Sequence, residues 1–320
     1  MRIAAIIVNY RTPELTLEVV RSLRKEMSRL APFRIYLVDN ASGDNSIPLF
    51  KAAAEHDGWG AEVELVEAPR NGGFGYGINQ AVRRGLALEG PPSYFYVLNS
   101  DAFVDPGSLD RLVAFLDSHA DAGLAGSHIH GTDGKTQVAA FRFPSLLSEF
   151  ESSANVGFVT RLLRKHVVSL PAPDADREVD WISGTSMLIR RETFERAGFF
   201  DEGFFLYFEE IDFCLTARKA GFKSYFVAHA PITHIGAVST GMVDETRRMP
   251  AYWFDSRYRY FRKHHGSLYA TACDLTRAAG MMIWYAKEKA LRRPSKSRPK
   301  MVRDLVAASW RNLRKSGLGI

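Results

Sequence analysis

Short runs of aliphatic and β-branched residues alternate with segments of helical periodicity through the first hundred residues of this chain. The apolar runs occupy residues 3–8, 35–38, 63–66 and 94–98, and helical patterns cover residues 13 to about 29 and a segment after Gly77. This alternation is typical of βαβ units. We therefore predict an α/β fold built on a mostly parallel, Rossmann-like sheet.

Polar residues follow three of these predicted strands directly. They are Asn9 and Tyr10, Asp39 and Asn40, and Asn99, Ser100 and Asp101. In open α/β sheets, ligands bind outside the carboxyl ends of the strands. Side chains at these positions could hold a base, a ribose or a metal-bound phosphate.

The rest of the chain has a different character. From about residue 120 the alternation is lost, and residues 131–134 predict a turn between two short strands. Residues 251–320 have helical patterns that a basic linker at 294–299 interrupts. The last helical pattern is amphipathic, with one apolar face formed by Val302, Leu305, Val306, Trp310 and Leu313.

Positive charge is concentrated at the C-terminal end. Residues 247–320 hold 18 of the 42 Lys and Arg but only 4 of the 36 Asp and Glu. The rest of the chain therefore holds 24 Lys and Arg against 32 Asp and Glu. A basic, amphipathic end suits an anionic membrane surface, although a solvated helical face or an oligomer contact also explains it. Nucleic-acid binding is not expected, because the sequence carries no recognition signature for it.

The hydrophobic content, the cysteine count and the apolar runs indicate what kind of protein this is and in which compartment it folds. The 320 residues, 46% of them hydrophobic, can bury a full core. Cys214 and Cys273 are too few for a disulfide framework or a thiolate metal site, which fits a reducing cytosolic compartment. The run at 3–8 is shorter than the apolar core of a secretory signal, and the uncharged stretch at 224–243 is too polar to cross a bilayer as a helix.

A glycine-dense segment at residues 71–79 includes Asn71, Gly73, Phe74 and Asn79 and precedes a helical pattern. Backbone amides at a helix start can approach a diphosphate closely. The segment does not match the dinucleotide fingerprint, because Ile78 stands where the last glycine is required. A plain turn before a helix is an equally good interpretation.

Two further residue groups could carry chemistry. Asp101 projects from a predicted strand end and could bind a hard divalent cation, with an Asp that caps a turn as the alternative. His234 could complete that site, although a lone His is more often structural. An aromatic-rich stretch at 199–208 leads directly into Glu209, Glu210 and Asp212. Desolvation beside aromatic rings raises carboxyl pKa values, as a general base for a sugar hydroxyl requires.

The order of these motifs resembles that of the family 2 glycosyltransferases with the GT-A fold, and specifically their rhamnosyltransferase-like branch. The resemblance covers about residues 1 to 265. The matching segments are residues 8–10, 38–40, 71–75, 98–101, 181–184, 198–202 and 205–212, together with His234.

The resemblance implies a role for each matching residue. Asp39 would contact a pyrimidine base, Asp101 and His234 would hold Mg²⁺ or Mn²⁺ on the diphosphate, and Glu210 would be the base. The donor site would also include Asn9, Tyr10, Asn71, Gly73, Phe74, Asn79, Asn99, Ser100, Trp181 and Gly184. Two departures from the family pattern are Asn99 in place of the first Asp of a D-x-D pair, and Glu210 where many relatives carry Asp. The second departure leaves Glu209 and Asp212 as competing bases.

The implied reaction transfers one sugar, with inversion, to a saccharide or polyprenyl-linked acceptor of cell-surface polysaccharide synthesis. The resemblance favours L-rhamnose as the sugar and dTDP-rhamnose as its donor. A UDP-hexose donor and a non-catalytic nucleotide-sugar-binding subunit are the alternatives. We expect a catalytic domain at 1–265, with a donor half at 1–120 and an acceptor half at 121–250, and a basic helical extension at 266–320. A cytoplasmic protein, peripheral on the inner face of the membrane and able to form a homodimer, would fit this reaction.

Overall fold

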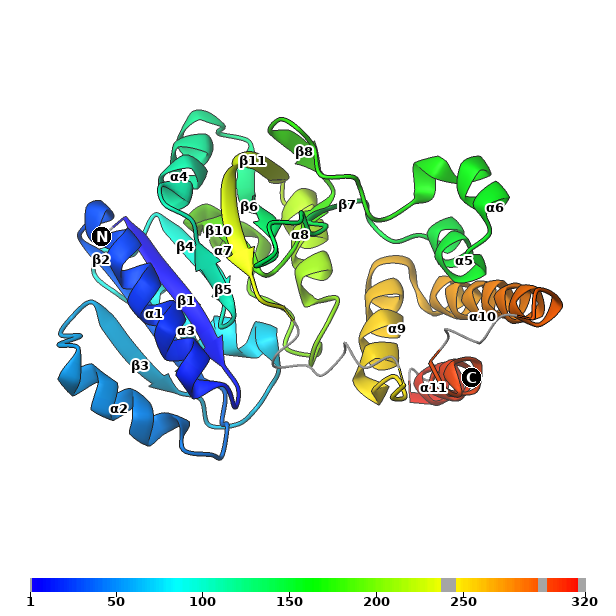
Figure 1. Cartoon of the computed structure of the whole chain (residues 1–320), viewed down its shortest axis with the longest axis horizontal. Helices are drawn as coiled ribbons and strands as arrows, with labels where there is room; N and C mark the ends of the chain where they lie inside the picture. The colour runs from blue at the N-terminus through cyan, green and yellow to red at the C-terminus, as the bar shows by residue number, and fades with distance from the viewer. Residues whose placement is uncertain (1, 237–245, 293–297, 316–320) are drawn as a thin grey trace. The chain divides into compact units, whose positions relative to one another are not determined.

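The computed structural model describes residues 2–236, 246–292 and 298–315 (Figure 1). By internal packing these residues form two compact units. The first comprises the described residues in 2–141, 170–202 and 209–236, and the second those in 142–169, 203–208, 246–292 and 298–315. The functional boundaries expected at residues 120, 250 and 265 remain a prediction. The linker expected at 294–299 lies largely outside the described residues.

The first unit contains a large mixed sheet with the strand order β3-β2-β1-β4-β10-β6-β11-β5, and β8 pairs with β11. Strands β1 to β4 run parallel, whereas β10 lies antiparallel between β4 and β6. This confirms the predicted α/β class with a mixed second half. The strands span β1 Ile3–Asn9, β2 Phe33–Asp39, β3 Val63–Glu67, β4 Tyr94–Asn99, β5 Ala102–Val104, β6 Ala122–His130, β8 Arg177–Val179, β10 Ser186–Arg190 and β11 Lys223–His234.

Helices cover this sheet. Every residue of β1 is buried, as expected for a central parallel strand whose sequence is almost wholly apolar. The helices of this unit are α1 Pro13–Met27, α2 Ser46–His56, α3 Phe74–Leu86, α4 Ser108–Ser118, α7 Arg191–Ala197 and α8 Glu209–Lys219.

The register places the polar strand ends together. Asn9 pairs with Asp39 across β1 and β2, and Val8 pairs with Asn99 across β1 and β4. Strand β10 is antiparallel to both β4 and β6, so β6 runs in the same direction as β4. Strand β11 is parallel to β6, and His234 at its C-terminal end therefore lies at the same edge of the sheet. The predicted carboxyl edge is therefore where the polar groups gather.

Two local predictions need correction. The helix expected after Gly77 begins at Phe74, because Gly73 adopts a φ of 95° and turns the chain into α3. A Cβ atom at Gly77 would lie 2.7 Å from a methyl carbon of Val8, so this glycine lets α3 lie close to β1. Residues 131–134 do form a turn, but only an isolated bridge between His130 and Thr136 follows it in place of a second strand.

The second unit is helical. Its helices are α5 Leu146–Ala154, α6 Gly157–Leu162, α9 Ala251–His265, α10 Ser267–Ala290 and α11 Met301–Lys315. Its apolar core joins α9, α10 and α11 through Phe254, Ala278, Met281, Met301, Leu305 and Ala308. The fully buried Arg257 lies between Glu149, at 2.7 Å, and Asp274. Within the described part of the chain, no helix is long and apolar enough to cross a bilayer.

Candidate active site

A buried polar network fixes Asp39 at the carboxyl edge of the sheet. The amide nitrogen of Asn9 donates to Asp39 Oδ1 at 2.8 Å, and Asn9 Oδ1 accepts a hydrogen bond from Thr16 at 2.9 Å. The backbone N–H of Ser42 donates to Asp39 Oδ2 at 3.0 Å, and the Ser42 hydroxyl donates to Oδ1 at 2.6 Å. Asn9 therefore orients Asp39, and its own side chain is fully buried.

Asn40 follows the same strand end, where the sequence predicted a polar ligand contact without assigning this residue a specific role. Its amide nitrogen donates to the carbonyl oxygen of Gly73 at 3.0 Å and to Asn71 Oδ1 at 3.1 Å, and Asn71 Oδ1 also accepts from the Gly73 N–H. The Asn40 Oδ1 atom is buried and has no hydrogen-bond partner. A buried acceptor without a partner is costly, so a ligand donor is expected there. Its position directly after Asp39 was the available sequence signal.

Asp101 and His234 meet where β5 and β11 pair. His234 Nε2 lies 3.2 Å from Asp101 Oδ1, and the two side chains are only 15% and 8% exposed. The backbone N–H of Ile235 donates to the Asp101 carbonyl oxygen at 3.0 Å. The two residues predicted to share a cation are therefore brought together from positions 133 residues apart in sequence.

Gln137 fixes the orientation of His234 and was missed by the sequence analysis. Its Nε2 donates to the His234 carbonyl oxygen at 3.2 Å, so its Oε1, 3.0 Å from His234 Nδ1, is the acceptor. Nδ1 then donates to Gln137, and Nε2 is the ring nitrogen that faces the Asp101 carboxylate. The segment after the glycine turn gave no sequence signal of this contact.

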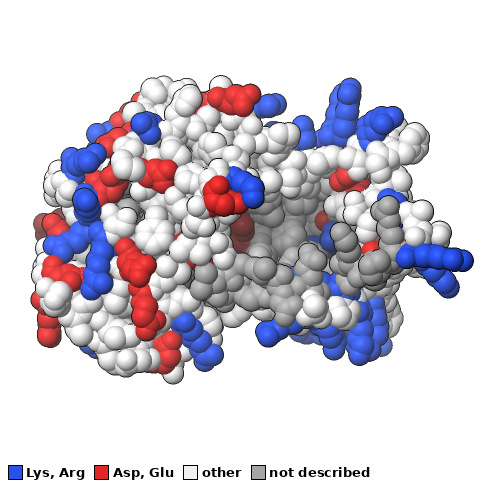
Figure 2. Space-filling model, in the orientation of Figure 1, with Lys and Arg blue, Asp and Glu red and all other residues white. Residues whose placement is uncertain are grey.

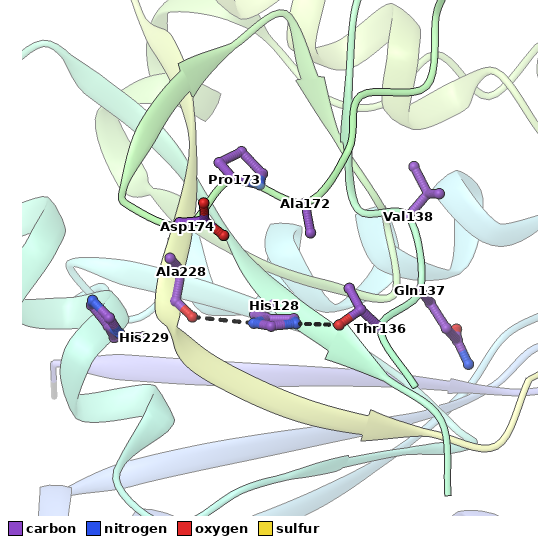
Figure 3. A pocket seen from close by; sticks show the side chains of 9 residues that line it. All are labelled: His128, Thr136, Gln137, Val138, Ala172, Pro173, Asp174, Ala228 and His229. Carbon is purple, nitrogen blue, oxygen red and sulfur yellow. Dashed lines mark hydrogen bonds between the residues drawn. The ribbon is translucent and has the colours of Figure 1, made fainter. Parts of the chain in front are cut away.

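Gln137 also lines a pocket of about 560 Å³ that His128, Thr136, Asp174, Ala228 and His229 border. The His128 ring joins β11 to the segment after the turn, through the Ala228 carbonyl oxygen at 3.3 Å and the Thr136 hydroxyl at 3.1 Å. Figure 3 shows the His229 ring lying apart from these contacts. A pocket of mixed polar and apolar lining therefore adjoins the residue that orients His234.

The acidic start of α8 lies beside the glycine-dense segment. A Cβ atom at Gly75 would lie 3.6 Å from Glu209 Cβ, and one at Gly184 would lie 3.3 Å from the Phe74 ring and 3.8 Å from Glu210 Cβ. The next residue, Thr185, accepts a hydrogen bond from the Asn99 N–H at 2.9 Å through its carbonyl oxygen. The loop at 183–185 therefore connects the acidic turn to the strand end that precedes Asp101.

Two carboxylate oxygens in this turn are buried without hydrogen-bond partners, Glu209 Oε2 and Glu210 Oε2. Burial raises the pKa of Glu210 to about 7. Burial, and then the negative charge of Glu210, raises the pKa of Glu209 well above its ordinary value. Asp212 is 2% exposed. The chain enters this turn through Tyr207 and Phe208, whose φ angles of 67° and 69° are costly for aromatic residues and mark a strained approach.

The other predicted donor-site residues are placed as follows. Asn79 is buried and exchanges hydrogen bonds with the Phe200 backbone at 2.8 and 3.1 Å, which holds α3 against the segment before α8. Trp181, in the two-stranded pair β7 Ala140–Phe141 and β9 Trp181–Ile182, stacks on Phe141 with ring centroids 3.8 Å apart. Ser100 is buried, and Asn99 and Tyr10 are partly exposed at the strand ends. Their contacts with a donor remain predictions.

Comparison with known proteins agrees with the motif order. Residues 1–266 match the sequence profile described as "Glycosyltransferase like family 2". The chain is 28% identical over 254 residues to the N-acetylglucosaminyl-diphospho-decaprenol L-rhamnosyltransferase of Mycobacterium tuberculosis H37Rv, covering 76% of this chain and 75% of that protein. It is 29% identical over 160 residues to the rhamnosyltransferase WbbL of Escherichia coli K12, covering 48% and 58%.

A solved structure shows the same fold. The mannosyltransferase PcManGT of Pyrobaculum calidifontis, in complex with GDP-Man and Mn²⁺, superposes with a TM-score of 0.61 at 15% identity and covers 99% of this chain and 88% of that one. This likeness confirms the expected GT-A fold. Because the family profile spans most of the chain and the predicted motifs gather at one sheet edge, the chain belongs to glycosyltransferase family 2.

Proposed function

We propose that this glycosyltransferase moves one sugar, L-rhamnose from dTDP-L-rhamnose, to a lipid-linked or saccharide acceptor with inversion at the anomeric carbon. The rhamnosyltransferase relatives from Mycobacterium tuberculosis and Escherichia coli support the choice of sugar. The name of the mycobacterial relative supports an acceptor carried on a prenyl diphosphate. A UDP-hexose is the second donor to test.

The observation that carries the proposal is the buried, partnerless oxygen of Glu210 beside Gly184 and Phe74. A structural carboxylate would be paired or solvated, since burial of an unpaired charge is costly. A carboxylate with a pKa of about 7 is suited to accept a proton near neutral pH. A binding subunit without catalysis would have no use for such a group.

In the proposed reaction, the acceptor hydroxyl oxygen attacks the anomeric carbon while the bond from that carbon to the diphosphate oxygen breaks. The hydroxyl proton moves to the Glu210 carboxylate, and the nucleoside diphosphate leaves with the bonding electron pair. Asp39 and Asn40 would bind the base and ribose, because both lie at the strand end beside the glycine-dense segment. A single displacement of this kind inverts the configuration.

Asp101 and His234 would hold a divalent cation, Mg²⁺ or Mn²⁺. Asp101 Oδ1 and His234 Nε2 lie 3.2 Å apart, a separation that suits neighbouring ligands of one cation, and carboxylate and imidazole are both ligands that Mn²⁺ accepts. No group of three or more His, Cys, Asp and Glu side chains gathers for a metal among the described residues, so phosphate and water would complete the shell. When bound, such a cation offsets the charge that develops on the leaving diphosphate.

Gln137 should act as a positioning residue for this pair. We expect Gln137→Leu to weaken Mn²⁺ binding by roughly 10- to 100-fold, because His234 loses the acceptor that fixes its ring proton on Nδ1. The measurement is the electron paramagnetic resonance signal of free Mn²⁺ in a titration with dTDP present, together with the ¹⁵N shifts of His234. Gln137→Glu keeps an acceptor and should bind Mn²⁺ nearly as the wild type does. Wild-type affinity in a well-folded Gln137→Leu protein would contradict this role.

The whole proposal is tested by incubating the purified chain with dTDP-L-rhamnose or UDP-hexoses, Mn²⁺ or Mg²⁺, and a short-chain N-acetylglucosaminyl-diphosphoprenol. Metal-dependent formation of a glycosylated product by mass spectrometry, with inverted anomeric configuration by NMR, is expected. Donor binding by calorimetry without any turnover would favour a binding subunit. Retention of configuration would exclude the single displacement.

A further inference from the structure

The outward face of α10 is apolar along most of its length. Between Ser267 and Ala286 every exposed residue is hydrophobic, and these residues are Leu268, Leu275, Ala279, Met282, Ile283 and Ala286. Leu268 is 86% exposed, Leu275 64% and Met282 63%. The spacing of these three leucine and methionine side chains by seven residues keeps them in one row, and the row from Leu268 to Ala286 extends roughly 27 Å.

The charged residues of the same stretch of α10 face inward. Asp274 is 4% exposed and bonds to the buried Arg257, while Arg277 donates to Glu149 at 3.0 Å. This arrangement is the reverse of an ordinary surface helix, which turns its apolar side to the core. An exposed apolar stripe of this length is typical of a surface that binds a membrane or another protein.

Exposed Lys and Arg side chains flank the stripe at both ends. Arg262 and Lys263, at the end of α9, are exposed just before it, and Lys289 and Arg292 are exposed just after it. Figure 2 shows Lys and Arg predominating over the helices of the second unit, whereas both charge signs are mixed over the sheet unit. An apolar stripe flanked by cations is complementary to a bilayer with anionic headgroups.

Pairing with a second copy of the chain is disfavoured by the same charges. In a two-fold symmetric contact the stripes would lie parallel or antiparallel. Because both ends of the stripe are basic, either alignment brings cations of one copy against cations of the other. An anionic lipid surface removes this repulsion.

We infer that α10 lies in the headgroup region of an anionic bilayer, with Leu268, Leu275 and Met282 inserted among the acyl chains. Of the apolar face expected on α11, Leu305 is buried in the core of the unit and Val302 packs against that core, whereas Val306 and Trp310 are 50% and 57% exposed. The inference rests on the exposed stripe and its flanking charges. It adds to the proposed function by placing an acceptor carried on a lipid and the enzyme at the same surface.

The test uses the full chain and flotation with vesicles of phosphatidylcholine containing roughly one third phosphatidylglycerol. The double variant Leu275→Gln/Met282→Gln should bind these vesicles roughly 100-fold more weakly than the wild type, because two apolar side chains no longer enter the bilayer. Wild-type binding to pure phosphatidylcholine should also be weaker by at least an order of magnitude.

The matched control is Phe158→Gln/Leu162→Gln on α6, where both side chains are 72% exposed in the same unit. It should retain binding within about threefold, since it leaves the α10 stripe intact. Equal loss in both variants, or wild-type binding in the α10 variant, would overturn the inference. The inference would also be overturned if sedimentation velocity showed a dimer for the wild type and a monomer for the α10 variant, while the variant still bound vesicles as the wild type does. Transfer to a short, water-soluble acceptor should be unchanged in the α10 variant, which separates this test from that of the proposed reaction.

Discussion

Glu210→Gln should lower kcat by about 10³-fold while leaving the dissociation constant of the donor nearly unchanged, within the roughly 10²- to 10⁴-fold range of a general base. Gln keeps the size and the helix position of the side chain, so the loss isolates the proton acceptor. The expected measurement is single-turnover transfer to a soluble acceptor, combined with calorimetric binding of the nucleotide sugar.

Glu209→Gln and Asp212→Asn are the discriminating controls. Glu209 is 3% exposed and Asp212 is 2% exposed, so neither is expected to reach an acceptor hydroxyl as Glu210 would. We expect each to retain activity within about tenfold of wild type, the residual effect coming from altered packing of the turn. A loss of about 10³-fold in Glu209→Gln with a mild effect in Glu210→Gln would transfer the base role to Glu209.

The pH dependence of kcat/KM should rise through an apparent pKa of about 7, because Glu210 must be deprotonated to accept the proton. The value belongs to the Glu209–Glu210 pair, so both carboxyls contribute to the observed titration. Burial is the first cause of the raised pKa of Glu210, and the rising limb should therefore persist in Glu209→Gln. A limb near the ordinary carboxyl pKa of 4.5 would show that the site is solvated in the working enzyme.

The same shift has a consequence for stability. A carboxyl whose folded pKa is raised binds its proton more tightly in the native state, so stability is lost as pH rises from about 4.5 to about 7. Glu210→Gln should therefore become more stable than the wild type across this window, by at most about 3 kcal/mol at pH 8. Thermal unfolding at pH 5 and pH 8 measures the difference. A gain at pH 8 together with lost activity would show that the buried charge serves function at a cost in stability.

Much of the sheet edge could be predicted from sequence because its signals are local. A parallel strand and the polar residue after it are neighbours in sequence, so Asp39 and Asp101 were assigned to one edge before their positions were known. The aromatic-rich entry to Glu210 is also local. Burial of the acid follows from the aromatic residues directly before it, so the local sequence is enough to predict the raised pKa of Glu210.

Contacts between distant segments were not predictable in the same way. Gln137 and His234 are 97 residues apart, and no pattern in either segment encodes their hydrogen bonds. The α10 stripe was missed for a different reason. Apolar residues surround much of this helix, so periodicity could not tell the inward face from the outward face, and only the position of Arg257 shows why Asp274 points inward.

The second large effect is expected at Asp101. Asp101→Asn preserves the shape of the side chain and removes its negative charge, which leaves His234 as the remaining proposed protein ligand. We expect kcat/KM to fall by roughly 10³-fold, since metal stabilisation of a leaving group is worth several kcal/mol. Mn²⁺ affinity should fall in parallel, which a titration without any acceptor measures independently of turnover.

Asp105→Asn is a matched control for this variant, because Asp105 also pairs with a histidine of the same sheet. Its Oδ2 lies 2.9 Å from His130 Nε2, and its Oδ1 accepts a hydrogen bond from Thr233 at 3.2 Å. This carboxylate has its partners within the protein, so its loss should change stability slightly and Mn²⁺ affinity within about threefold at most. If Asp101→Asn kept wild-type Mn²⁺ affinity, the cation would have to bind elsewhere, and the proposed site at Asp101 and His234 would be wrong.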